Sequence, residues 1–270
     1  MDGFARRCGP LGRLAFALAA MACAPQAARA GAWTQNAGEG LIITSLWGWV
    51  GHGAPWGGFY PTVQQSQAEL QTYGEYGLSD VWTIYGQMAI ECERLSPPAQ
   101  SLYVGPDYSS LGLRAKLWAT GGWVVSGEAT MFFPGATYPR SPAQAGDNGG
   151  AAEGRGLAGY SFSLGSMPGF LDLELAWRFR TAGPPDEIHA DATIGLKPRP
   201  GVIVMLQNFA VVSAPSINRS FPAWRQDMIE ASMVVPLSDR WSLQLGWFTT
   251  LLAVKTNTER GLAVALWRKF

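Results

Sequence analysis

The chain has 270 residues, with 20 basic and 20 acidic side chains, 33 glycines and 12 tryptophans. Residues 1–30 hold four of the basic residues and one acid, so the remainder of the chain carries 16 basic and 19 acidic residues. This balance argues against a cationic nucleic-acid binder. No stretch after residue 30 reaches the roughly 18 uninterrupted apolar residues of a transmembrane helix.

The first 30 residues are typical of a secretory signal peptide. Basic residues precede an apolar stretch at 14–23, and a small-x-small cleavage site ends at Ala30. We therefore expect cleavage after Ala30 and one domain at 31–270. Lipidation of Cys23 is a competing interpretation of the same segment. After cleavage Cys92 is the single cysteine, so no internal disulfide is expected.

Alternation of apolar and polar residues predicts β-strands along the rest of the chain. The clearest case is 169–181, where large apolar residues alternate with residues such as Asp172 and Glu174. A helix with this sequence would spread its charges around its whole circumference. The same test predicts twelve strands, at 40–49, 64–76, 82–91, 111–118, 123–133, 156–165, 169–181, 187–196, 202–213, 224–235, 241–248 and 262–270.

The connections between these strands alternate between short turns and mostly longer loops. The expected turns are 77–80, 121–122, 166–169, 197–201 and 237–240. The expected loops are 50–62, 94–109, 134–153, 182–186, 214–222 and 254–257. This pattern predicts an all-β fold, a transmembrane antiparallel up-and-down β-barrel of about 12 strands. Barrels of 10 or 14 strands and a soluble secreted β-sandwich stay open as alternatives.

Charged residues gather on the polar face of the predicted strands, which faces the lumen of a barrel. If these groups pair with one another they plug the lumen, and if water separates them they line a small pore. The sequence leaves both outcomes open. The expected lumen charge network comprises Glu69, Glu91, Arg114, Lys116, Glu128, Asp172, Glu174, Arg178, Arg180, His189, Asp191 and Glu230.

Catalysis and metal binding find little support in this network. His189 lies on the polar face near carboxylates, but no serine with a nucleophile signature accompanies it. His189 and Asp191 supply only two metal ligands, too few for a site. We therefore expect no enzyme, no catalytic residue, no metal and no cofactor.

Aromatic residues fall on both faces of the predicted strands. Those on the inner face are candidates for stacking on an aromatic solute, or they simply fill a narrow lumen. The inner set comprises Tyr73, Tyr85, Trp118, Phe132 and Phe248. Tryptophans on the outer face are typical of the girdles that anchor a barrel at the membrane interface. The outer set comprises Trp82, Trp123, Trp177, Trp224, Trp241 and Trp247.

Several segments together resemble a known group of bacterial membrane proteins. These are the export signal, YGEYGLSDVWTIYG at 73–86, the FLDLELAWRF…DATIGL hairpin, and the ending GLAVALWRKF with terminal Phe270. They resemble proteobacterial outer-membrane β-barrels similar to the meta-pathway phenol-degradation (MetA-like) barrels, over essentially all of 31–270. The resemblance implies that Phe270 is read by the outer-membrane assembly machinery, although Arg268 stands where an aromatic residue is commoner in that signal.

These patterns lead to an expected function at the outer membrane of a Gram-negative cell. We expect a narrow, porin-like channel for passive passage of small, hydrophobic or aromatic solutes. The alternative is a closed structural or interaction barrel that presents external loops to envelope partners. The expected partners are outer-membrane lipid, the assembly machinery and a small-molecule solute, with no nucleic acid.

Overall fold

A computed structural model describes residues 31–53, 63–135, 149–181, 184–216 and 222–270. The expected signal peptide at 1–30 lies outside these residues, as do most of the expected loops at 50–62 and 134–153. No helix in the described part of the chain is long and apolar enough to cross a membrane.

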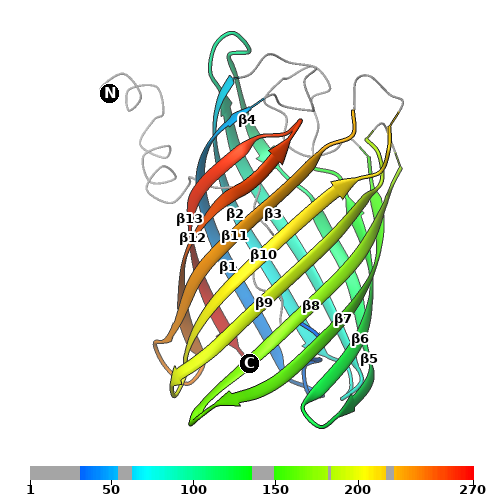
Figure 1. The fold of residues 1–270 in the computed structure, drawn as a ribbon, viewed down its shortest axis with the longest axis vertical. Coiled ribbons are helices and arrows are strands. Elements are labelled where there is room, and N and C mark those ends of the chain that lie inside the picture. Colours follow the sequence, from blue (N-terminus) through cyan, green and yellow to red (C-terminus); the bar gives the residue numbers. More distant parts are fainter. Residues whose placement is uncertain (1–30, 54–62, 136–148, 182–183, 217–221) are drawn as a thin grey trace.

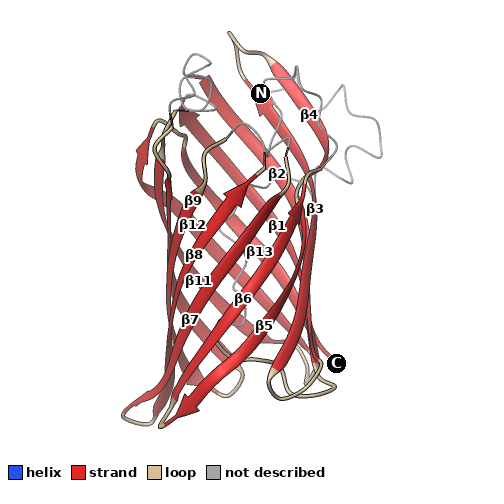
Figure 2. Cartoon of the chain, turned by 90° about the vertical axis from the view of Figure 1, so that its right-hand side faces the viewer, coloured by secondary structure: helices blue, strands red, loops and turns tan. Residues whose placement is uncertain are grey.

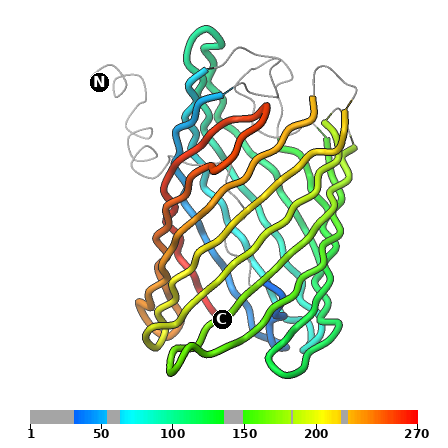
Figure 3. Tube along the Cα trace, viewed as in Figure 1, coloured from blue at the N-terminus to red at the C-terminus, as the bar shows by residue number. Residues whose placement is uncertain are grey.

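Thirteen antiparallel strands make up most of the described chain (Figure 1). They are β1 (Gly40–Gly53), β2 (Val63–Gly77), β3 (Trp82–Leu95), β4 (Ser101–Pro106), β5 (Ser109–Thr120), β6 (Trp123–Phe133), β7 (Ala151–Leu164), β8 (Met167–Arg180), β9 (Glu187–Arg199), β10 (Val202–Ser213), β11 (Arg225–Pro236), β12 (Trp241–Val254) and β13 (Thr258–Lys269). Because β1 pairs with both β2 and β13, the sheet closes on itself. The strands are tilted from the long axis of the barrel (Figure 3).

Strands β4 and β5 together occupy the position of a single strand in the barrel. Both pair with β3, β4 along its second half and β5 along its first half. The barrel therefore has twelve strands, which confirms the predicted fold and strand number. The loop expected at 94–109 is wrong in part, because its second half forms β4.

The two ends of the barrel differ in their connections. Residues 78–81, 121–122, 165–166, 200–201 and 237–240 make short connections at one end, called here the turn end. Gly121 and Gly122 both have positive φ, which suits a two-residue hairpin turn. The C-terminus lies at the turn end, and the longer connections lie at the opposite, loop end (Figure 2).

Apolar side chains cover the outside of the barrel, and polar side chains line much of the inside. On β8, Leu175 is 62% exposed on the outer face, whereas Asp172 on the inner face is 4% exposed. Trp82, Trp123 and Trp241 each begin a strand at the turn end and are exposed. This arrangement is typical of a lipid-facing belt with an aromatic girdle.

Candidate functional site

The inner wall formed by β5 to β9 carries arginines that form buried ion pairs with acids on the same strand and on other strands. Arg114 on β5 is fully buried. Its Nε lies 2.6 Å from Glu128 Oε1 on β6, and its Nη1 lies 3.2 Å from Glu75 Oε2 on β2. These contacts connect residues of three strands on the inner wall, β2, β5 and β6.

Arg155 on β7 forms ion pairs with three acids at once. Its Nε lies 3.0 Å from Glu153 Oε1, and its Nη1 lies 2.5 Å from both Glu174 Oε2 and Asp191 Oδ2. Glu174 and Asp191 are directly opposite each other in the register of β8 and β9. Like charges in that position repel each other, so the arginine stabilises this pair of neighbouring strands.

Arg178, Arg180 and His189 gather on the same wall toward the loop end. Arg178 Nη2 lies 2.8 Å from Glu153 Oε2. Arg180 Nη2 lies 2.5 Å from Glu187 Oε1, and His189 Nε2 lies 3.1 Å from Glu187 Oε2. His189 thus has a carboxylate neighbour, which fits an ion-pair network within the lumen wall.

The other acids and bases of the predicted network also lie on the inner side. Glu230 on β11 is buried, and Gln244 Nε2 lies 3.4 Å from its Oε1. Lys116 on β5 is half-buried opposite Ser126 of β6, near the turn end. The structure thus brings most of the network together on β5 to β9, while Glu69, Glu91 and Glu230 lie on β2, β3 and β11.

The segment before β1, residues 31–35, is buried or half-buried against the inner wall of the barrel and is called here the strap. The backbone N–H of Ala32 donates a 2.9 Å hydrogen bond to Asp172 Oδ1. Arg114 Nη1 donates a 2.9 Å hydrogen bond to the carbonyl oxygen of Trp33. The strap therefore occupies part of the lumen and makes hydrogen bonds with the same charged residues that form the wall.

Further contacts hold the strap on both sides. Gln35 Nε2 donates a 2.5 Å hydrogen bond to Glu75 Oε1, and its backbone N–H donates one of 2.9 Å to Thr83 Oγ1. The indole ring of Trp33 packs edge-on against Phe170, with ring centroids 6.0 Å apart. The sequence gives no signal for this placement, because it depends on contacts with residues far along the chain.

A second region of the inner wall, on β2 and β3, is acidic. Glu69 and Glu91 are buried and directly opposite each other. Gln71 Nε2 donates a 3.0 Å hydrogen bond to Glu69 Oε1, and Gln67 donates a hydrogen bond to Glu91. Within the described residues, no salt bridge reaches Glu69 or Glu91.

Four of the five predicted lumen aromatics are buried on the inner side, namely Tyr73, Tyr85, Phe132 and Phe248. Tyr73 Oη donates a 2.8 Å hydrogen bond to Glu75, and Tyr85 Oη lies 2.6 Å from Thr130 Oγ1. Phe248 packs against Trp47, with ring centroids 5.6 Å apart. These rings are part of the packed wall.

The inner placement predicted for Trp118 is wrong. A β-bulge between Lys116 and Trp118 adds one residue to β5, and Trp118 then pairs with Val125. Because one extra residue reverses the alternation of faces, Trp118 lies on the outer side and is 51% exposed. Trp224, predicted outside, is half-buried just before β11.

Several inner residues were missed because strands extend beyond their predicted ends. Glu153 lies within a segment expected to be a loop, yet the alternation of 156–165 continues back through it. Asp107 was likewise placed in a loop. Among the acids that the structure describes on the inner wall, Glu93, Glu187 and Glu259 are also buried. Acids therefore outnumber bases on the described inner wall.

A cavity of about 770 Å³ opens at the loop end of the barrel, between β1, β2, β3, β12 and β13. Its lining includes Gln64, Gln65, Leu95, Thr250 and Glu259. Most of the residues that line the cavity are of polar or charged type.

The C-terminal residue, Phe270, contacts the first two strands at the turn end. The backbone N–H of Phe270 donates a 3.0 Å hydrogen bond to Gly40 O, and its ring stacks on Tyr76 with centroids 6.4 Å apart. The Arg268 guanidinium lies 5.5 Å from the ring centroid of Trp241. The expected assembly signal is thus joined to the first strands of the barrel.

No family model and no curated protein matches the chain. Among solved structures, it is similar to the COG4313 outer membrane channel from Pseudomonas putida F1, with a TM-score of 0.73 and 12% identity over 91% of this chain and 100% of that chain. The translocator domain of the autotransporter NalP from Neisseria meningitidis has a TM-score of 0.51 and 9% identity, over 87% of this chain and 90% of that chain. The NanC porin has a TM-score of 0.51 and 7% identity, over 84% of this chain and 100% of that chain. The chain therefore has the fold of outer-membrane β-barrels.

Proposed function

We propose that this chain forms a narrow channel in a bacterial outer membrane, through which small solutes pass passively. The observation that carries the proposal is a closed barrel with an apolar outer face and a charged inner face. A lipid-facing exterior requires membrane insertion, and charged groups on the inner wall favour water and polar solutes. The outer membrane channel and the porin among the similar structures support the same proposal.

The charge of the inner wall indicates which solutes pass most readily. Because acids outnumber bases on the described inner wall, cations are favoured over anions in the lumen. The resemblance to phenol-degradation barrels extends the proposal to small aromatic solutes. Tyr73 and Tyr85 are neighbouring inner rings, with centroids 6.2 Å apart, and would line that path.

A closed barrel that presents its loops to envelope partners is the second candidate function. The strap favours it, because Ala32 is fully buried within the barrel and is held there by Asp172 and Ser126. In that case the ion pairs and the strap together keep solutes out of the turn end.

Electrical recording in a planar lipid bilayer distinguishes the two candidates. We expect refolded residues 31–270 to give discrete conductance steps, with a reversal potential in a KCl gradient that shows cation preference. Glu174→Ala should weaken this preference and Arg178→Ala should strengthen it, because each removes one lumen charge. Asp239→Ala, in an exposed turn, is the matched control.

A folded, heat-modifiable protein that conducts no ions would contradict the channel proposal and favour the closed barrel. An open channel whose reversal potential is the same in both lumen variants as in the unmodified protein would contradict the proposed role of Glu174 and Arg178 in ion selectivity. Blockade of the conductance by phenols or aromatic acids would support the aromatic part of the proposal, and its absence would reject that part.

A further inference from the structure

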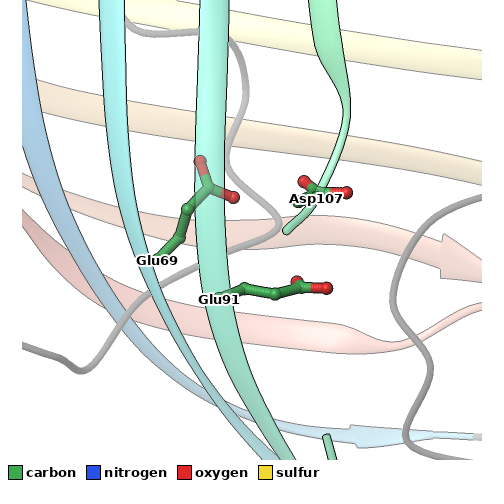
Figure 4. Close-up of side chains that lie close together, drawn as sticks. All are labelled: Glu69, Glu91 and Asp107. Carbon is green, nitrogen blue, oxygen red and sulfur yellow. The ribbon is translucent and has the colours of Figure 1, made fainter. Parts of the chain in front are cut away.

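Three acidic side chains meet on the inner wall at a place where no base neutralises them. Glu69 comes from β2, Glu91 from β3 and Asp107 from the junction of β4 and β5 (Figure 4). One carboxylate oxygen from each of the three lies within 4.8 Å of the other two. Within the described residues, no salt bridge reaches any of the three.

A specific backbone feature brings the third acid to this place. Ile90 pairs with Pro106 and Gln87 pairs with Ser110, so two residues of β3 lie opposite three residues, 107–109. This β-bulge adds one residue between β4 and β5, so the alternation of inner and outer side chains shifts by one position there. The backbone N–H of Asp107 still bonds to Ala89 O at 3.0 Å. The bulge thus inserts Asp107 into the wall beside the two glutamates.

The barrel contains a second pair of acids that lie directly opposite each other, but an arginine contacts both members of that pair. Glu174 and Asp191 are also directly opposite partners. There, Arg155 lies between them and bonds to both at 2.5 Å. Beside Glu69 and Glu91 the neighbouring side chain is a further carboxylate, Asp107, and no arginine of the described residues forms a salt bridge with this cluster.

Unpartnered buried oxygens at the cluster point to a bound ligand. Glu91 is 3% exposed, and its Oε1 has no hydrogen-bond partner. Gln71, which donates to Glu69, is 4% exposed, and its amide oxygen Oε1 also has no partner. A buried oxygen without a donor is costly unless a proton donor or a cation satisfies it.

We propose that Glu69, Glu91 and Asp107 bind a divalent metal cation, with Ca²⁺ the best fit and the Gln71 amide oxygen as a further ligand. The three carboxylate oxygens lie no more than 4.8 Å from one another. An ion placed between them would therefore be no more than about 2.8 Å from each oxygen, which is near the calcium–oxygen bond length of roughly 2.3–2.6 Å. Carboxylate and amide oxygens are the ligands that this hard cation prefers. The bound cation would join β2, β3 and the β4–β5 junction, and it does not depend on whether the barrel conducts.

Isothermal titration calorimetry on the protein purified in detergent and stripped with EDTA tests the site. We expect one CaCl₂ equivalent to bind, and MgCl₂ to bind more weakly. Glu69→Gln, Glu91→Gln and Asp107→Asn should each weaken Ca²⁺ binding about tenfold or more, because each removes one charged ligand. Glu230→Gln, which removes a buried inner carboxylate on β11, should keep one bound Ca²⁺ with unchanged affinity.

Folding of each variant is checked by heat-modifiable migration in electrophoresis. Should a variant fail to fold, the unmodified protein still decides the matter, since its thermal midpoint should rise with CaCl₂ and fall back with EDTA. Absence of saturable Ca²⁺ binding by the unmodified protein would overturn the proposal. Binding that all three folded variants retain at full affinity would overturn it equally.

Discussion

Arg155 shows what a buried charge requires at the scale of a single residue. The side chain is removed from water, yet it contacts Glu153, Glu174 and Asp191. Desolvation of such a group costs several kcal/mol, and only well-placed partners offset that cost. Removal of the arginine leaves Glu174 and Asp191 directly opposite each other without this cation between them, whereas Glu153 keeps its contact with Arg178.

We expect Arg155→Gln to lower the free energy of unfolding by about 3–5 kcal/mol, because it leaves uncompensated buried carboxylates. Urea unfolding in lipid vesicles, followed by tryptophan fluorescence, measures the change. Arg199→Gln, at the exposed turn end of β9, should alter stability by less than about 0.5 kcal/mol. Equal stability of Arg155→Gln and the unmodified protein would show that the ion pairs do not hold the wall.

Residue placement could be predicted from the sequence wherever the alternation is unbroken. Asp172, Glu174 and Arg178 lie inside because they share one phase of a regular strand. Trp118 and Asp107 could not be placed, because each lies at a β-bulge. A single extra residue reverses the phase and leaves no mark in the local composition.

At the scale of an element, the strap is the segment that changes the lumen of the barrel most. It brings backbone groups into the lumen, where Asp172, Ser126 and Arg114 bond to them. Its position also depends on a glycine, because a Cβ at Gly159 would lie 2.6 Å from the Trp33 ring. The strap and β7 can therefore be separated by one substitution.

We expect Gly159→Val to displace Trp33 and to raise the single-channel conductance, because the strap no longer fits against β7. Gly156→Val is the matched control, since Gly156 lies on the exposed face of the same strand with open space around its Cβ position. Both variants add a residue that suits a strand. Identical conductance of the two would mean that the strap does not narrow the lumen.

The lengths of several strands were underestimated from the sequence, and for one reason. Strands β1, β3, β7 and β12 extend beyond the predicted segments toward the loop end. There the outer positions hold polar or small residues such as Arg94 and Gly154, so the contrast between the faces fades. Backbone pairing continues regardless, because each neighbouring strand supplies partners for its hydrogen bonds.

At the scale of the whole molecule, alternation and connection lengths were sufficient to predict the architecture. Twelve amphipathic segments, joined by short turns at one end, have one arrangement that buries every strand edge, namely a closed barrel. The state of the lumen could not be predicted in this way. It depends on side chains and a strap that meet across the barrel, far apart in sequence.

The passage of solutes through this lumen is the central claim, and a liposome-swelling assay tests it most directly. Proteoliposomes that contain refolded residues 31–270 are diluted into isotonic solutions of small neutral, cationic and anionic solutes, and the light scattering is recorded. The account predicts swelling with small solutes, fastest for cations and slowest for anions, and little swelling with large sugars. Protein-containing liposomes that swell no faster than protein-free liposomes with any solute would contradict it.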